Sequence, residues 1–180
     1  MAILRDNLTF RNCTMQDLDA VMELQKQVDD GMNNHDWFVS TSREENTIFL
    51  TAPNTIIGFF DGEKLIAYGS IGFPGKDTAN LGWDLGWTEE KALRCATLDT
   101  IVVDANYRGL GLQRKLIDLC VKYARNIMAD CIVLTTICPD NIYSLRNGLA
   151  QGFEILMRKQ KYGGVDRYIL GLLPSKQIII

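Results

Sequence analysis

The chain has 180 residues, of which 47% are hydrophobic and 23% are charged, a balance that predicts one globular domain with a sizeable core. Its formal net charge of −3 and its pI of about 5.2 argue against general nucleic-acid binding, which needs a basic surface. The sequence contains no run of about 18 apolar residues, so no membrane span is expected. The first residues also lack the apolar core of a signal peptide.

Strand and helix patterns alternate along the chain. In chain order we expect a strand over 8–13, helices over 14–29 and 43–49, strands over 55–61, 64–73 and 93–104, a helix over 109–126, a strand over 131–137, a helix over 141–151, and strands over 153–162 and 165–173. Asp61-Gly62 is a type I′ hairpin signal, and Gly163-Gly164 is a second turn signal. Residues 74–91 form a long glycine-rich excursion. This order predicts an α/β domain around a mixed sheet.

The cysteines and the single histidine indicate a reducing compartment. An odd number of cysteines, without a CxxC pair and without an export signal, predicts free thiols in the cytoplasm. With one histidine and no paired cysteines, we expect no zinc site and no other metal. The five cysteines are Cys13, Cys95, Cys120, Cys131 and Cys138.

The stretch YRGLGLQRKL, residues 107–116, places Gly109 and Gly111 where the predicted strand passes into a helix. The first turn of a helix has N–H groups without intrahelical partners, at the positive end of the helix dipole. Glycine keeps side chains away from those groups and tolerates positive φ. The stretch therefore favours either a phosphate-binding loop or a tight turn without a ligand.

The same stretch excludes two nucleotide-binding motifs and resembles a third. The Walker A pattern is absent, and the Rossmann pattern would need glycine at the position of Arg114. The sequence does fit R-x-x-G-x-(G/A) from Arg108, with Gly111 as its glycine, although Gln113 stands where the pattern has Gly or Ala. It resembles motif A of the GNAT superfamily of acyl-CoA N-acyltransferases, in which the loop and the helix N-terminus bind the pyrophosphate of coenzyme A.

A second landmark of the superfamily is an asparagine that opens a helix, a small residue three positions on, and Gly-Phe at the start of the next strand. Asn141, Ser144 and Gly152-Phe153 have this spacing, and the order of elements is similar from about residue 8 to 173. The resemblance implies a single domain over residues 1–180, with a GNAT-like mixed, mostly antiparallel central sheet flanked by helices. It also implies acetyl-CoA as co-substrate and no metal.

The resemblance further implies which residues contact coenzyme A. The backbone of the strand before motif A would pair with the pantetheine arm, and Asn141, with Ser144 on the same helix face, would contact that arm. Asn141 is equally suited to be an N-cap, which is compatible with this role. The strand residues are Ile101, Val102 and Val103. The residues around the pyrophosphate are Arg108, Gly109, Leu110, Gly111, Leu112, Gln113 and Arg114.

Asp99 is the candidate catalytic base, because acetyl transfer to an amine needs a group that removes the amine's proton. It lies four residues before Val103, so the period of two predicts that both share a face of the strand. An acid within the run ATLDTIVV is costly unless it is paired or functional. The alternative is a structural aspartate that is salt-bridged or exposed near the start of the strand.

The general acid is where the sequence departs from the resemblance. Many family members carry tyrosine seven residues after the asparagine, and here that position is Gly148. On the same helix, the Ser144 hydroxyl lies one turn away and Tyr143 points off the face. Either no acid is used, or one comes from elsewhere, such as Tyr162 or Tyr168.

Several other residues have two interpretations. Trp83 and Trp87 would either wall an acceptor pocket or pin the long loop to the core, and His35 would either contact substrate or be solvated. Cys138 is expected to be a buried, inert thiol. Five acids lie where this family commonly shapes the acceptor site, and they either attract a cationic amine or are merely solvated. They are Asp29, Asp30, Asp36, Glu44 and Glu45.

Together these features predict a cytoplasmic N-acetyltransferase that moves an acetyl group from acetyl-CoA directly to a primary amine. The acceptor would be a small molecule or a peptide, with no nucleic-acid or membrane partner, and a homodimer is compatible with this reading. Two alternatives stay open. One is a non-catalytic acyl-CoA-binding sensor, which Gly148 favours, and the other is an acyltransferase that uses a longer acyl-CoA.

Overall fold

A seven-stranded sheet forms the centre of the computed structural model, which describes residues 8–174. Its strand order is β1-β2-β3-β4-β5-β7-β6, and all neighbouring strands are antiparallel except β4 and β5. The strands are β1 (Leu8–Asn12), β2 (Thr55–Asp61), β3 (Lys64–Gly72), β4 (Cys95–Val103), β5 (Ile132–Ile137), β6 (Glu154–Lys161) and β7 (Val165–Leu172). The expectations for residues 1–7, which concern a signal peptide, and for 175–180, as part of the domain, lie outside the described residues.

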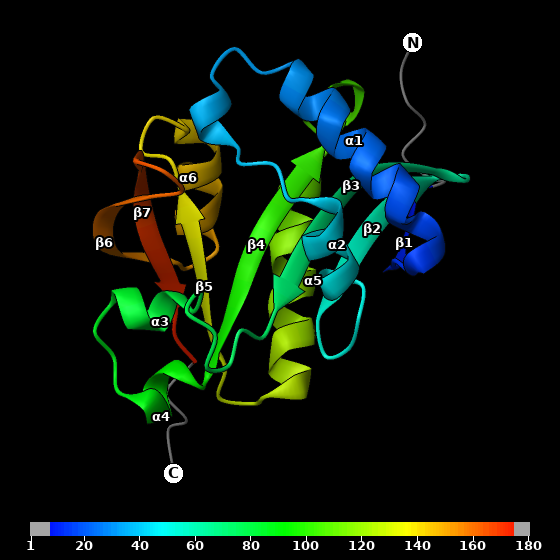
Figure 1. Cartoon of the computed structure of the whole chain (residues 1–180). Helices are drawn as coiled ribbons and strands as arrows, with labels where there is room; N and C mark the ends of the chain where they lie inside the picture. The colour runs from blue at the N-terminus through cyan, green and yellow to red at the C-terminus, as the bar shows by residue number, and fades with distance from the viewer. Residues whose placement is uncertain (1–7, 175–180) are drawn as a thin grey trace.

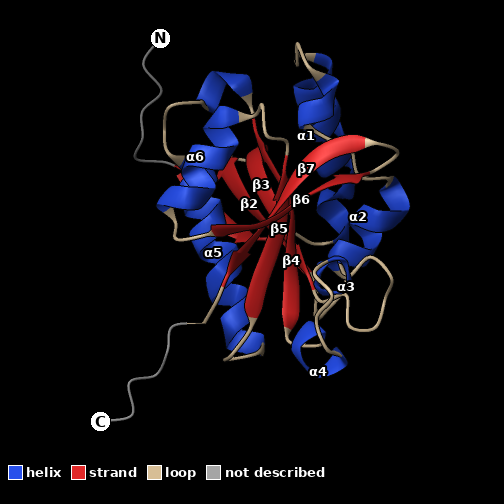
Figure 2. Cartoon of the chain, turned by 90° about the vertical axis from the view of Figure 1, so that its left-hand side faces the viewer, coloured by secondary structure: helices blue, strands red, loops and turns tan. Residues whose placement is uncertain are grey.

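Helices cover both faces of this sheet, as Figure 1 and Figure 2 show, with α1 and α2 on one face and α5 and α6 on the other. Val21 and Leu24 of α1 are buried against the first face, and Leu116 and Cys120 of α5 are buried against the second. The helices are α1 (Leu18–Asp30), α2 (Arg43–Phe49), α3 (Leu81–Asp84), α4 (Glu89–Ala92), α5 (Leu112–Ile127) and α6 (Ile142–Ala150). The predicted GNAT-like, mostly antiparallel sheet flanked by helices is confirmed.

The differences from the predicted elements lie at turns and loops. The 74–91 excursion holds α3 and the start of α4. The helix expected from residue 109 begins at Leu112, because Gly109 and Gly111 have φ values of +81° and +72°. The hairpin between β2 and β3 forms, but only Gly62 of its two loop residues has positive φ. A type I′ turn needs positive φ at both, so that turn type is wrong.

The parallel strands β4 and β5 separate soon after they meet. They pair at three positions, Cys95 with Ile132, Ala96 with Val133 and Thr97 with Leu134. Beyond Thr97 the two strands diverge, as the green and yellow arrows in Figure 1 show. The second half of β4 stays paired with β3 through Val103. One edge of β4 therefore has backbone N–H and C=O groups that no strand among the described residues pairs.

A β-bulge interrupts β4 at Asp99. The backbone pairs on either side are Ser70 with Thr100 and Ile71 with Leu98. Asp99 is thus an extra residue that faces no partner on β3. Bulges are common next to active sites, because they re-aim a side chain without breaking the sheet.

The bulge also changes which face of the sheet the side chains of β4 meet. Leu98 packs in the cluster beneath α5 and Val103 packs against the same cluster, whereas Val102 packs in the cluster beneath α1. Asp99 lies toward α2, beside Thr100. The prediction that Asp99 shares a face with Val103 is therefore wrong, because the period of two holds only for a strand without a bulge.

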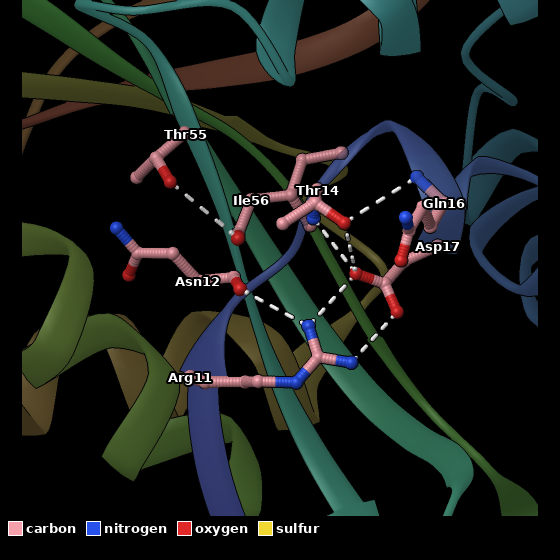
Figure 3. Close-up of polar contacts among 7 residues, drawn as sticks. All are labelled: Arg11, Asn12, Thr14, Gln16, Asp17, Thr55 and Ile56. Atoms are coloured by element: carbon pink, nitrogen blue, oxygen red, sulfur yellow. Dashed lines mark hydrogen bonds and ion pairs between the residues drawn. The ribbon is translucent and has the colours of Figure 1, made fainter.

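An ion pair and a capping box fix the short 3₁₀ turn Met15–Asp17 that leads into α1 (Figure 3). The Thr14 hydroxyl accepts a hydrogen bond from the backbone N–H of Gln16, and the Asp17 carboxylate accepts one from the backbone N–H of Thr14. Both terminal nitrogens of Arg11 donate to the same carboxylate at 2.8 Å. These hydrogen bonds, first of all those from Arg11, lower the pKa of Asp17 to about 2. The predicted helix start is confirmed.

We expect Asp17→Asn to lower the free energy of unfolding by about 1–2 kcal/mol near neutral pH. Because the folded pKa of Asp17 lies below its ordinary value, this stabilisation is complete above the unfolded pKa of about 4 and is lost as pH falls through the folded pKa of about 2. Denaturant unfolding at about pH 7 and about pH 3 should show a smaller difference at the lower pH. Glu23→Gln, on the exposed side of α1, is the control, and an equal difference at both pH values would refute the assignment.

Candidate active site

The gap between β4 and β5 opens into a cavity of about 260 Å³ that reaches both faces of the sheet. Its walls on the α5 and α6 face include Gln113, Ile117, Asn141, Ser144, Gly148 and Phe153. Its walls toward α1, α2 and the β6–β7 hairpin include Trp37, Thr41, Glu45, Tyr162 and Arg167. Asp99, Thr100, Ile101, Thr135 and Thr136 line it from the strands. Two molecules that enter from opposite faces can therefore meet between the strands.

The glycine loop lies at the start of α5 and leaves its N-terminus open. Gly111 is the N-cap of α5 in the left-handed conformation, and no side chain caps the helix there. A Cβ atom added to Gly109 or Gly111 would meet no atom within 4 Å. The N–H groups of the first turn thus face open space at the positive end of a 16-residue helix. Positive φ makes glycine suitable for the turn as well, so the two interpretations of these glycines are compatible.

Gln113, which departs from the motif, connects the first turn of α5 to α6. Its Nε2 donates to the Ser144 hydroxyl at 3.1 Å, and its Oε1 accepts from Asn147 Nδ2 at 2.5 Å. Arg114 Nε donates to Asn147 Oδ1 at 2.8 Å. These bonds direct both side chains toward α6 and away from the glycine loop, so the larger residue at position 113 leaves the helix N-terminus accessible.

Asn141 caps α6, as its N-cap interpretation predicts. Its Oδ1 accepts a hydrogen bond from the backbone N–H of Ser144 at 3.1 Å. Its Nδ2 donates to none of residues 8–174, and the side chain lines the cavity. Capping thus leaves the donor end of Asn141 available to a ligand. Gly148, about two turns along the helix from Asn141, also lines the cavity, and an added Cβ there would make only ordinary contacts of 3.5 Å with Ile137 and 3.7 Å with Leu170.

Asp99 is the acid at the centre of the cavity. Its carboxylate accepts a hydrogen bond from the Thr100 hydroxyl at 2.9 Å, and Thr100 meets the Thr41 hydroxyl at 3.2 Å. Asp99 is exposed on the side of the open cavity, but protein surrounds the carboxyl on its other sides, and this burial raises its pKa, with a smaller contribution from the charge of Glu45. No cationic side chain of residues 8–174 lies within salt-bridge distance of Asp99. The salt-bridged alternative therefore finds no support in the described residues.

Tyr162 closes the cavity from the β6–β7 hairpin. It has a φ of +52°, unusual for a residue with a side chain, and its hydroxyl lies 3.2 Å from that of Thr136. The residue as a whole is 49% exposed, but its hydroxyl end lies against the protein at Thr136, and this burial raises the pKa of the hydroxyl. Of the other tyrosines considered as acids, Tyr143 is 76% exposed and Tyr168 packs against the core cluster beneath α5. Tyr162 is the one of these three that lines the cavity.

A sequence model of the acetyltransferase (GNAT) family matches residues 18–153, which is well over half of the chain. The chain belongs to the GNAT acetyltransferase family. The resemblance read from Gly111 and Asn141 is therefore confirmed, together with the fold that it implied. No curated protein matches the chain at a significant level.

Solved GNAT structures share this fold at low sequence identity. The yncA protein of Salmonella typhimurium, described as an acetyltransferase and solved with its cofactor acetyl-CoA, is 17% identical, with 97% of this chain and 98% of that chain covered and a TM-score of 0.69. A GNAT acetyltransferase of Streptococcus pneumoniae is 17% identical, with 93% and 99% covered and a TM-score of 0.70. The ribosomal-protein-S18-alanine N-acetyltransferase of Escherichia coli is 15% identical, with 96% and 99% covered and a TM-score of 0.69.

The tryptophans of the long loop lie away from the cavity of this GNAT protein. Trp83 Nε1 donates to the carbonyl oxygen of Asp77, and Trp87 packs against the core while Lys91 lies 3.6 Å from its ring centroid. They pin the loop, which was one of their two interpretations. His35 lies outside the cavity and is largely solvated, with 69% of its side chain exposed, while its Nδ1 lies 3.0 Å from the Asp29 carboxylate. Cys138 is buried, as expected.

The five acids of the region before α2 have different roles. Asp29 accepts hydrogen bonds from His35 and from the Ser40 hydroxyl and so closes the loop between α1 and α2. Asp30 pairs with Lys26, and Asp36 and Glu44 are exposed outside the cavity. Glu45 lines the cavity while its carboxylate accepts from the backbone N–H of Ser42 at 2.7 Å. One of the five thus lines the cavity.

Sequence reasoning did not identify Trp37, Thr100 or Arg167 as cavity residues. Trp37 is the last residue of a short 3₁₀ turn capped by Asn34, and its buried Nε1 has no acceptor among residues 8–174. No local pattern indicates which loop will cover the gap between two strands. A signal was available for Arg167, since a cation inside the apolar run of a buried strand is costly unless it is paired or functional.

For the described part of the chain, no helix is long and apolar enough to cross a membrane. The same residues contain no group of three or more His, Cys, Asp or Glu side chains that could hold a metal ion.

Proposed function

We propose that the protein transfers an acetyl group from acetyl-CoA directly to a primary amine. The observation that carries this proposal is Asp99, a carboxyl with a raised pKa at the point where the cavity passes between β4 and β5. A base there faces both an amine from the α1 and α2 face and a thioester from the α5 and α6 face. The yncA structure contains acetyl-CoA, and the NatC complex, a neighbour with 14% identity, was solved with a peptide and CoA.

The chain's own residues offer a place for each part of the donor, which supplies an activated acetyl thioester. The open N-terminus of α5 and the loop at Gly109 and Gly111 suit a pyrophosphate. Arg108 is exposed beside them and adds positive charge. The free backbone edge of β4 at Ile101–Val103 suits the amide groups of the pantetheine arm, and Asn141 Nδ2 is a further donor for them.

The amine nitrogen would bond to the acetyl carbonyl carbon while the carbon–sulfur bond breaks and the sulfur leaves as a thiolate. The amine must be neutral to attack, so Asp99 takes its proton, directly or through a water, and releases it to solvent. Thr100 and Thr41 hold the carboxylate in position. Placing amine and thioester together supplies up to about 7–11 kcal/mol in ideal cases.

The leaving thiolate needs no dedicated acid in this scheme, because its pKa is only modestly above neutral. We expect Ser144→Ala, Tyr143→Phe, Tyr162→Phe and Tyr168→Phe each to change kcat less than about tenfold. Tyr143 and Tyr168 lie outside the cavity and are the controls for Tyr162. Steady-state kinetics with intact coenzyme A affinity is the measurement. A loss of about a thousandfold in Tyr162→Phe alone would identify Tyr162 as the acid.

A panel of primary amines, with detection of free thiol, tests the proposed function. Thiol release that depends on one class of amine supports it. Tight acetyl-CoA binding without release for any amine would favour the sensor, for which Gly148 in place of tyrosine is the supporting observation. The mass of a co-purified acyl group would reveal a longer acyl donor. We further propose one domain over residues 1–180 in the cytoplasm, acting on small molecules or peptides, with the homodimer as the assembly to test.

A further inference from the structure

We propose that the acceptor carries a carboxylate in addition to its amine, and that Arg167 binds this carboxylate. The inference rests on the function proposed above and narrows its substrate class to amino acids and related amino-carboxylates. Arg167 lies on β7 and lines the part of the cavity that is open to the α1 and α2 face.

The guanidinium of Arg167 is buried without a carboxylate to neutralise it. The residue is 3% exposed, and within residues 8–174 its side chain makes a single hydrogen bond, from Nη1 to the carbonyl oxygen of Asp166 at 3.0 Å. No carboxylate of the described residues lies within salt-bridge distance. Arginine keeps its charge in a protein interior, so burial without a partner is costly. A ligand carboxylate would remove that cost, and the planar fork of the guanidinium suits it in a bidentate pair.

The acids near Arg167 in sequence or space already have cationic partners. Asp166 is held by Arg158 from the neighbouring strand, through Nε at 3.0 Å and Nη2 at 2.5 Å. Asp84 of α3 pairs with Lys159 and Lys161 of β6. None of these carboxylates is left over for Arg167. Asp99 and Glu45, the carboxyls of the cavity itself, lie beyond salt-bridge distance of Arg167, so no carboxylate of residues 8–174 pairs with this buried cation.

The carboxyl of Asp99, which carries the charge opposite to that of Arg167, lines another part of the same cavity. The charges of both Asp99 and Arg167 act on the Tyr162 hydroxyl. Burial raises the pKa of this hydroxyl most, the Asp99 charge raises it further, and the Arg167 charge lowers it. The Tyr162 ring also lies 5.6 Å from the Arg167 guanidinium carbon. Tyr162 is thus placed near both an anion and a cation. An acceptor with its ammonium at Asp99 and its carboxylate at Arg167 would match this charge separation.

The test is a set of matched acceptors, the common L-amino acids and their carboxamides, which differ in the carboxylate alone. We expect kcat/KM of the wild type to favour the best acid over its amide by roughly 30-fold or more. Arg167→Met replaces the cation with an unbranched apolar side chain, and it should bring the ratio of kcat/KM for acid over amide close to one. Arg43→Met removes a cation that lies outside the cavity, has a 54% exposed side chain and pairs with Asp19, and it should leave the ratio as in the wild type.

A ratio near one in the wild type, or a high ratio retained in Arg167→Met, would overturn the proposal. A purely structural Arg167 would lower the melting temperature and reduce kcat/KM for acids and amides equally, so the ratio separates the two roles. If Arg167→Met does not fold, Arg167→Lys keeps the charge without the bidentate geometry and should lower the ratio by a smaller factor.

If no acceptor releases thiol, the proposed transfer fails, and calorimetry then decides the Arg167 site by itself. Binding of amino acids but not of their amides to the wild type, with binding lost in Arg167→Met, would still support a carboxylate site in a protein that does not catalyse. Absence of amino-acid binding to the wild type would overturn it.

Discussion

Gly111→Glu is expected to abolish the binding of coenzyme A while the chain stays folded. A carboxylate at this position would lie at the open N-terminus of α5, against the diphosphate and at the N–H groups that would hold it. The loop is exposed, so the change costs little packing. Isothermal calorimetry with coenzyme A is the measurement, and thermal unfolding checks the fold.

Two controls separate charge from backbone strain in this experiment. Gly86→Glu introduces the same side chain at another exposed glycine with positive φ, +67°, outside the cavity, and should leave affinity intact. Gly111→Asn keeps a residue that tolerates the left-handed conformation without adding charge, and should weaken binding less than Gly111→Glu. Coenzyme A affinity that is unchanged in Gly111→Glu would remove the phosphate-binding interpretation of the loop.

Asp99→Asn is expected to lower kcat/KM by roughly 10² to 10⁴ near neutral pH, with coenzyme A affinity unchanged. Burial raises the pKa of Asp99, so in the wild type the deprotonated base forms as pH rises through a value above the ordinary one. The asparagine variant has no carboxyl at this position and therefore no such deprotonation. Its deficit should shrink at high pH, where the free amine is abundant without a base. A pH profile of kcat/KM for both proteins is the measurement.

Glu45→Gln is the matched control for Asp99→Asn, because Glu45 is a second carboxyl in the same cavity but is held by the backbone N–H of Ser42. Its effect on kcat/KM should be less than about tenfold. Normal activity of Asp99→Asn together with a lower melting temperature would make Asp99 a structural residue.

Features that depend on a few neighbouring residues could be predicted from the sequence. The turn at Gly109 and Gly111 needs positive φ and an open helix start, and both requirements lie within one short stretch. The capping roles of Thr14, Asp17 and Asn141 likewise depend on residues two or three positions away. For this reason the element order, the family and the expected position of the coenzyme A loop followed from sequence alone.

The tertiary structure decided how the cavity is assembled. A bulge at Asp99 depends on the register with β3, and this register is set by packing along the whole pair of strands, so the period of two placed Asp99 on the wrong face. Trp37, Asp99 and Arg167 come together from a loop, a central strand and a strand near the C-terminus. The residues next to each of them in sequence do not indicate that the three side chains lie around one cavity. Three-dimensional contacts also show that Arg167 is buried without a carboxylate partner among residues 8–174, whereas Arg158 on the adjacent strand is exposed and paired with Asp166.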